Sequence, residues 1–440
     1  MDRPHILYLH SHDTGRYVQP YGHAVPTPNV QRLAEEGVLF RQAFAVAPTC
    51  SPSRAGLLTG MAPHAAGMTG LAHRGFSLTD PSRHLVPFLH GLGYTSALAG
   101  IDHVGLGRAP TECQFQTRLG DGHRAEDIAQ AACAFLAAPP KHPFFLSVGF
   151  FDTHREARDF PSRHEDVPPA DPRYAPVPPP LPDLPETRAD MAGFMGSARN
   201  LDAGIGAVLD QLDASGLAER TLVICTTDHG IAFPGLKCNL TAHGLGVMLI
   251  LRGPGGFAGG RVCDALVSQV DLFPTLCDLL GLPAPDWLQG TSLMPLIRGE
   301  REEVRDEVYG EVTYHAAYEP MRSVRTKRWS YIRRFGDRRR PVLANVDDGP
   351  SKDVMLELGW GERGLDEEEL YDLALDPIES RNRAADPGLA SVLADLRGRL
   401  DRWMEATEDP LLRGPVPAPS GAQVNGPDDP SPYGPLQVVP

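Results

Sequence analysis

The sequence predicts an α/β fold: a large, mostly parallel sheet sandwiched by helices, followed by a smaller C-terminal α+β domain. Apolar runs typical of buried strands alternate with amphipathic segments through the first two thirds of the 440 residues. Crossover helices connect parallel strands and pack on both faces of the sheet, so this alternation favours a parallel sheet. After Gly299 the pattern changes to short runs typical of hairpins.

Short apolar runs bounded by turn residues predict the strands of the large sheet. These strands are 6–10, 95–99, 144–151, 221–225 and 247–251. Apolar residues at helical spacing predict helices at 28–36, 53–58, 85–92, 125–137, 191–212 and 272–280. The first helix has the clearest start, because Thr27 is a suitable N-cap and Pro28 suits the first helical position.

The C-terminal third predicts a second, smaller unit. Two strands, 322–325 and 329–333, form a hairpin across 326–328, a further strand covers 369–373, and 389–405 is an amphipathic helix. We therefore expect a catalytic domain over 1–304, a small α+β domain over 305–412 and a Pro/Gly-rich tail over 413–440, either loose or wrapped around a neighbour. The Pro- and Asp-rich segment 161–185 is expected to be an ordered surface excursion near a site.

Composition excludes several classes of protein. A formal net charge of −15 argues against nucleic-acid binding and against binding to acidic membranes. The N-terminal residues lack a signal-peptide pattern, and no apolar run has the length of a transmembrane helix. Seven scattered cysteines are typical of reduced thiols, so we expect a cytoplasmic protein. A homo-oligomer is compatible with this composition.

Polar residues follow four predicted strands, at the edge where the carboxyl ends of parallel strands meet. These residues are His12, Asp13, His103, His154, Asp228 and His229. Carboxylates and imidazoles gathered at one edge predict a site for a divalent cation. A bound cation lowers the pKa of an attached hydroxyl, which then becomes a nucleophile near neutral pH. We take His12, Asp13, Asp228 and His229 as candidate ligands.

Cys50 begins the most specific motif of the chain, Cys-Ser-Pro-Ser-Arg-Ala-Gly-Leu-Leu-Thr-Gly. A helix that begins near Ser53 directs backbone N–H groups and the positive end of its dipole at Cys50. Pro52 suits the first turn, and Arg54 adds a permanent positive charge. Most free cysteines are small buried apolar residues, but this context predicts an anion-binding pocket around Cys50.

The motif resembles the signature of the sulfatase family, within the alkaline phosphatase superfamily. The resemblance implies that a formylglycine-generating enzyme oxidises Cys50 to formylglycine, which serves as the nucleophile and as a metal ligand. It also implies one bound calcium. The positions that match the family are Asp13, Cys50, Arg54 and Asp228. His12 replaces an aspartate and His229 an asparagine, and these softer ligands make manganese or zinc credible beside calcium.

The resemblance also implies catalytic roles for three further residues. His103 stands where the family has a histidine that takes a proton from the formylglycine hydrate, although Ile101 replaces the lysine of that segment. His154 is similar to the histidine near the leaving group. Lys237 matches a basic residue that holds the sulfate and the leaving oxygen, and it is one of only four lysines in the chain.

The remaining histidines are harder to assign. His73 and Arg74 are candidate substrate contacts, and so is His243; His64 and the first two could equally belong to a polar loop. Isolated histidines usually have structural or surface roles, which we expect for His5, His10, His84 and His142.

One branch of the family, the sulfamidases (N-sulfoglucosamine sulfohydrolases), is similar at several places. The similar segments are 103–105, 143–146, 228–234, 321–324 and 369–373, with Asp376-Pro377. The resemblance implies a hydrolase of sulfate esters or sulfamates, with a small-molecule or sugar sulfate as substrate. The exchanged ligands and the missing lysine leave open a phosphonate monoester or phosphodiester hydrolase on the same scaffold. A non-catalytic binding protein is the third alternative.

Overall fold

The computed structural model describes residues 3–105, 115–120, 122–160 and 170–440. Its eight-stranded sheet has the order β4-β3-β5-β1-β6-β7-β2-β8. The strands are β1 (His5–Ser11), β2 (Val38–Phe44), β3 (Thr95–Gly100), β4 (Thr117–Arg118), β5 (Phe144–Gly149), β6 (Thr221–Thr227), β7 (Leu249–Arg252) and β8 (Arg261–Ser268). All neighbours pair in parallel except β7, which is antiparallel to both β6 and β2. The predicted α/β class is confirmed.

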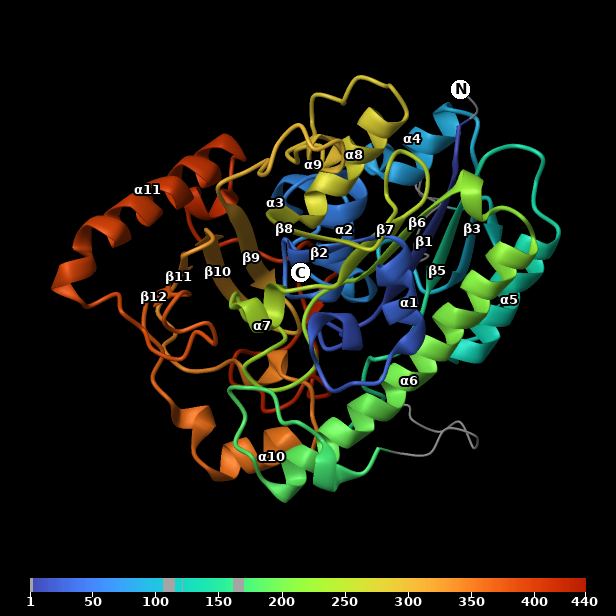
Figure 1. Ribbon diagram of the computed structural model, residues 1–440. Coiled ribbons are helices and arrows are strands. Elements are labelled where there is room, and N and C mark those ends of the chain that lie inside the picture. The colour runs from blue at the N-terminus through green and yellow to red at the C-terminus, as the bar shows by residue number, and fades with distance from the viewer. Residues whose placement is uncertain (1–2, 106–114, 121, 161–169) are drawn as a thin grey trace.

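Helices cover both faces of this sheet, as Figure 1 shows. Side chains of a strand alternate between faces: in β1, Ile6 and Tyr8 pack on one side, and Leu7 and Leu9 on the other. The first side holds α2 (Cys50–Thr59), α4 (Leu85–Gly91) and α8 (Leu272–Leu279). The second side holds α1 (Pro28–Glu36), α5 (Ala125–Ala137) and α6 (Pro185–Ala214). Both faces of the sheet are therefore buried against helices, which explains why its strands read as continuous apolar runs in the sequence.

The second sheet is antiparallel, with the order β12-β11-β10-β9. Its strands are β9 (Val308–Tyr314), β10 (Tyr318–Arg325), β11 (Trp329–Arg334) and β12 (Glu368–Asp372), so the hairpin across 326–328 forms as expected. Met321 and Ile332 pack toward the large sheet, whereas Val324 and Tyr331 pack against α11 (Ala390–Ala406). The small sheet thus lies between the large sheet and α11.

Short elements complete the chain: α3 (Pro63–Ala66), α7 (Ala242–Leu245), α9 (Met294–Ile297), α10 (Pro350–Glu357), β13 (Gln423–Val424) and β14 (Gln437–Val438). β13 pairs with β14, so the tail folds back on its own chain. In the predicted excursion 161–185, positions 161–169 lie outside the described residues. Ala170, Ala175 and Leu181, from its described part, pack in a small apolar cluster with α6. Among the described residues, no helix combines the length and apolarity needed to cross a membrane.

Candidate active site

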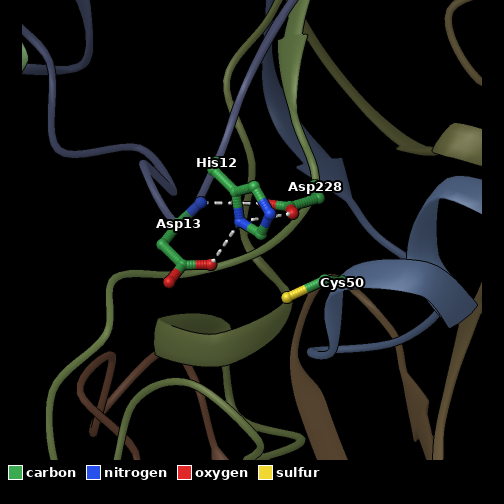
Figure 2. Close-up of side chains that lie close together, drawn as sticks. All are labelled: His12, Asp13, Cys50 and Asp228. Atoms are coloured by element: carbon green, nitrogen blue, oxygen red, sulfur yellow. Dashed lines mark hydrogen bonds and ion pairs between the residues drawn. The ribbon is translucent and has the colours of Figure 1, made fainter. Parts of the chain in front are cut away.

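The predicted site residues gather beyond the carboxyl ends of β3, β5, β1 and β6, which are neighbours in the sheet. His12 and Asp13 follow β1, and Asp228 follows β6. α2 begins at Cys50, three residues earlier than predicted, and its first side chain points toward this group (Figure 2). Cys50 is 3% exposed. We call the buried space among these side chains the cup.

Two carboxylates and one imidazole form the centre of the cup. His12 Nδ1 lies 3.1 Å from Asp13 Oδ1 and 3.2 Å from Asp228 Oδ2. The backbone N–H of Asp13 donates to Asp228 Oδ1 at 2.9 Å, which links the two strand ends. Asp13 has φ +53°, an unusual value for a residue other than glycine. This conformation presents both its N–H and its carboxylate to the same centre.

His229 turns one nitrogen into the cup. Its Nδ1 lies 3.0 Å from the Gly230 carbonyl, which can only accept, so Nδ1 carries the proton in the neutral ring. Nε2 then carries a lone pair, which faces Asp13 Oδ1 at 3.2 Å and Cys50 Sγ at 3.3 Å. A hydrogen bond that fixes the tautomer in this way is typical of metal-ligating histidines.

The spacing of these atoms fits a divalent cation. Atoms of His12, Asp13, Cys50 and Asp228 all lie within 4.8 Å of one another, and all four residues are buried. Ligands about 2.0–2.3 Å from a common ion stand about 3–3.7 Å apart. Four pairs of these atoms lie 3.1–3.3 Å apart, and His229 Nε2 lies 3.7 Å from Asp228 Oδ2, so the nearest separations are of this size. The buried His12 Nε2 has no hydrogen-bond partner in the described structure.

Two cations complete the electrostatics of the cup. Arg54 Nη2 donates to Asp228 Oδ2 at 2.9 Å, and Lys237 Nζ donates to Asp13 Oδ2 at 2.9 Å. Burial opposes the charge of Lys237, but Asp13 and Asp347 raise its pKa well above the usual range. Burial raises the pKa of the Cys50 thiol well above its ordinary value. An unmodified Cys50 is therefore a thiol, a weak nucleophile.

His10, expected to be structural, holds Arg54. Arg54 Nη1 donates to His10 Nδ1 at 2.5 Å, and His10 Nε2 lies 3.0 Å from Ser147 Oγ. Burial, with Arg54 second, lowers the pKa of His10 well below the usual range, so the ring is neutral and can accept. Its place inside β1 carries no sequence signal for this contact.

Replacing His10 by leucine is expected to lower the free energy of unfolding by about 1–3 kcal/mol, because a buried Arg54 N–H loses its acceptor. Chemical denaturation measures this loss. Ser147→Ala is the matched control: it removes the outer hydrogen bond and leaves the Arg54 contact, so about 1 kcal/mol or less is expected. Equal losses in the two variants would contradict the assigned role.

Two further imidazoles line the cup as predicted. The His12 ring lies 4.8 Å from that of His103 and 4.5 Å from that of His154, both edge-on. Burial, followed by the neighbouring His12, lowers the pKa of His103 well below the usual range. His103 is therefore neutral, and a neutral imidazole keeps one nitrogen lone pair. His154 Nδ1 lies 2.6 Å from the Arg155 carbonyl, and its Nε2 lies 4.0 Å from Asp13 Oδ2.

The three residues predicted to contact the substrate lie in different parts of the structure. The His73 ring lies 5.9 Å from that of His103, at the cup. Arg74 instead holds the C-terminal tail: Nη1 donates to Asn425 Oδ1 at 2.7 Å and Nη2 to the Pro432 carbonyl at 3.0 Å. His243 lies outside the cup, because α7 directs its ring toward the hydroxyl of Tyr17 and the Ile378 carbonyl.

His243 lines a different cavity, of about 320 Å³, between the loop that follows Lys237 and the small sheet. His64, left open by the sequence, also lies elsewhere. The His64 ring forms a hydrogen bond with the Glu311 carboxylate. Arg322 Nε donates to the neighbouring Asp409 Oδ2 at 2.5 Å. This buried ion network joins α3 to the C-terminal part of the chain.

Sequence reasoning missed two residues near Lys237. Asp347 Oδ2 lies 3.1 Å from Lys237 Nζ, and the buried His315 lies within electrostatic reach of both. They come from loops beside the small sheet and have no motif around them. Arg155 does not replace the missing lysine of the family pattern, because both of its terminal nitrogens donate to Asp190 at 2.7 Å.

A mostly parallel sheet with helices on both faces and buried carboxylates and imidazoles beyond neighbouring strand ends is an architecture typical of α/β enzymes. The sulfatase family profile matches residues 4–282, and the profile of the N-sulphoglucosamine sulphohydrolase C-terminal region matches 238–353. The human N-sulphoglucosamine sulphohydrolase is 32% identical over 89% of this chain and 88% of its own length. The chain therefore belongs to the sulfatase family and is a sulfatase enzyme.

Solved structures agree on the fold. An enzyme in complex with its substrate D-glucosamine-2-N,6-O-disulfate has a TM-score of 0.73 and 19% identity, with 94% of this chain and 99% of that chain covered. The phosphonate monoester hydrolase of Agrobacterium radiobacter has a TM-score of 0.68 and 21% identity, with 95% and 100% covered. At these identities the likeness extends to the fold alone.

Proposed function

We propose that this sulfatase hydrolyses a sulfate ester or sulfamate of a sugar, with formylglycine derived from Cys50 as the nucleophile. The observation that carries the proposal is the convergence of Cys50 Sγ with the His12–Asp13–Asp228–His229 cluster, inside a cup that also holds two cations. Arg54, Lys237 and the N-terminus of α2 place fixed positive charge where a sulfate group would sit. Similarity to the human sulphohydrolase supports a sulfated sugar as substrate.

The ligand set would hold one divalent cation through His12, Asp13, Asp228, His229 and the oxidised side chain at position 50. Such an ion supplies Lewis acidity and helps a hydroxyl to ionise near neutral pH. Two imidazoles in place of oxygen ligands make the set softer. We infer that manganese or zinc binds more tightly than calcium.

Other residues of the cup move protons and stabilise charge. Neutral His103 is placed to accept a proton at its imidazole. Lys237, held charged by Asp13 and Asp347, stabilises negative charge on sulfate and on the departing atom. His154, which is 22% exposed, faces the open side of the cup and is placed to act on the leaving group.

The purified protein is expected to hydrolyse an aryl sulfate or glucosamine N-sulfate faster than phenyl phosphonate. Release of sulfate, amine and phosphonate product is measured separately, with each candidate metal. The exchanged ligands and Ile101, where family members carry a lysine, favour phosphonate or phosphodiester hydrolysis as the second candidate. Faster cleavage of the phosphonate would favour it. Cleavage of none of these compounds by protein carrying formylglycine would favour a non-catalytic binding protein.

Metal preference is tested without an activity assay. After chelator treatment, manganese or zinc is expected to raise the melting temperature more than calcium at equal concentration, because a ligand of the folded state stabilises it. The matched variant His12→Asp/His229→Asn restores oxygen ligands. In this variant the difference in melting temperature between manganese or zinc and calcium is expected to shrink or change sign. A larger calcium effect on the unaltered protein would contradict the assignment.

The predicted cytoplasmic location is tested by fractionating cells of the native host.

A further inference from the structure

The C-terminal tail returns to the catalytic side of the molecule. We call residues 421–439 the strap. β13 pairs with β14 within it, Ala422 is fully buried, and Asn425 is 3% exposed. Figure 1 shows the C-terminus near the middle of the molecule, beside segments from the first and last thirds of the chain. The strap is therefore a fixed part of the structure, although its composition left open both a loose tail and one wrapped around a neighbour.

Three consecutive strap residues contact three separate segments that border the cup. Ser431 Oγ donates to Asp348 Oδ2 at 2.5 Å. The Pro432 carbonyl accepts from Arg74 at 3.0 Å, and the Tyr433 hydroxyl lies 3.5 Å from the Ala157 carbonyl.

Each of these segments also carries a residue of the cup. Asp347 precedes Asp348, His73 precedes Arg74, and His154 lies three residues before Ala157. Lys352 fixes the strap further, since its Nζ donates to the Pro430 carbonyl at 2.7 Å. Residues 430–433 thus run along the border of the cup, between the loops that supply its walls.

The path of the strap along the cup leaves one large side chain, that of Tyr433, exposed to solvent. Tyr433 is 63% exposed, although both the carbonyl and the N–H of the Pro432–Tyr433 peptide are hydrogen-bonded, to Arg74 and to Ser431 Oγ. Partial burial, then Asp347, raises the pKa of its hydroxyl, and Lys237 opposes the shift, so the hydroxyl lies within electrostatic reach of the cup. An exposed ring on a fixed backbone costs little entropy when it contacts a ligand.

We propose that the strap completes the substrate site and that Tyr433 packs its ring against the sugar that carries the sulfate. This inference rests on the proposed function and names the part of the chain that reads the sugar rather than the sulfate. The residues placed around the sulfate, Arg54, Lys237 and the ligand cluster, have their contacts without Tyr433. A small aryl sulfate would therefore need the cup but not the strap.

The test compares Tyr433→Ala with Tyr433→Phe on two substrates. For glucosamine N-sulfate, Tyr433→Ala is expected to raise KM about tenfold with little change in kcat, because the lost contact is made equally in the bound and transition states. Tyr433→Phe keeps the ring and should retain most of the affinity. For nitrophenyl sulfate both variants should match the parent. Leu436→Ala, at a 45% exposed position of the same strap, controls for general disturbance of the strap.

The inference would be overturned if Tyr433→Ala raised KM equally for both substrates or for neither. It would also be overturned if Leu436→Ala raised KM for glucosamine N-sulfate as much as Tyr433→Ala does. Binding is measured independently of turnover, by calorimetry of glucosamine N-sulfate on the Cys50→Ala protein with and without Tyr433→Ala. About tenfold weaker binding with Tyr433→Ala supports the inference even if the parent enzyme hydrolyses neither compound, an outcome that would refute the proposed function alone. Unchanged binding overturns the inference.

Discussion

Replacing Cys50 by alanine is expected to abolish hydrolysis, with a loss on the order of 10⁵-fold, the size seen when a covalent nucleophile is removed. The fold should survive, because alanine is smaller than cysteine and Cys50 contributes one sulfur to an otherwise polar cup. Turnover of a sulfate substrate and the melting temperature, measured on the same preparation, test both parts of this expectation.

Mass spectrometry of the peptide that contains residue 50 is the necessary companion measurement. Active protein is expected to carry the aldehyde or its hydrate, and the fraction oxidised should scale with activity across expression hosts. Cys50→Ser is the matched variant, since it retains a small polar side chain that cannot follow the same oxidation from a thiol. Full activity with an unmodified thiol, or with a serine that mass spectrometry shows to be unoxidised, would refute the formylglycine assignment.

Replacing Asp228 by asparagine is expected to cause the largest combined loss of stability and metal binding. Asp228 accepts from Arg54 at 2.9 Å and lies 3.2 Å from His12 Nδ1, and all three side chains are buried. Removing the carboxylate leaves a buried guanidinium without its only carboxylate partner among the described residues. Breaking such a pair costs about 3–5 kcal/mol. Denaturant unfolding and metal content per chain are the measurements.

Asp190→Asn provides the control for this prediction. Asp190 pairs with the buried Arg155 through two hydrogen bonds of 2.7 Å, outside the cup. The two variants should lose similar stability, but Asp190→Asn should bind metal like the parent protein. Equal metal content in the two variants would show that Asp228 is not a ligand.

Much of the site could be predicted because its polar side chains come directly after the ends of the strands. The buried strands are mostly apolar, so His12–Asp13 and Asp228–His229 stand out directly after β1 and β6. Parallel pairing of β1 with β5 and β6 then brings these ends together without any knowledge of side-chain contacts. The helix at Cys50 could be placed by its motif and by Pro52 in its first turn.

Other features depend on long-range contacts that leave no local pattern. β2 was missed because it follows α1 after one residue, Gly37, and β8 because its first residues are exposed and polar. Asp347 and His315 join the cup through the packing of the small sheet. The contacts of the strap could not be predicted because its anchors are distant in sequence: Asp348 is 83 residues from Ser431, and Arg74 is 358 residues from Pro432.

The burial of Cys50 has a consequence for the order of events in the life of the chain. In the folded protein Cys50 is 3% exposed, and its sulfur lies 3.3 Å from His229 Nε2. An oxidising enzyme would need to bind the peptide around position 50, and every residue of α2 is buried in the finished fold. If position 50 is converted, conversion therefore precedes closure of the sheet, while residues beyond 220 are still being synthesised or are not yet docked.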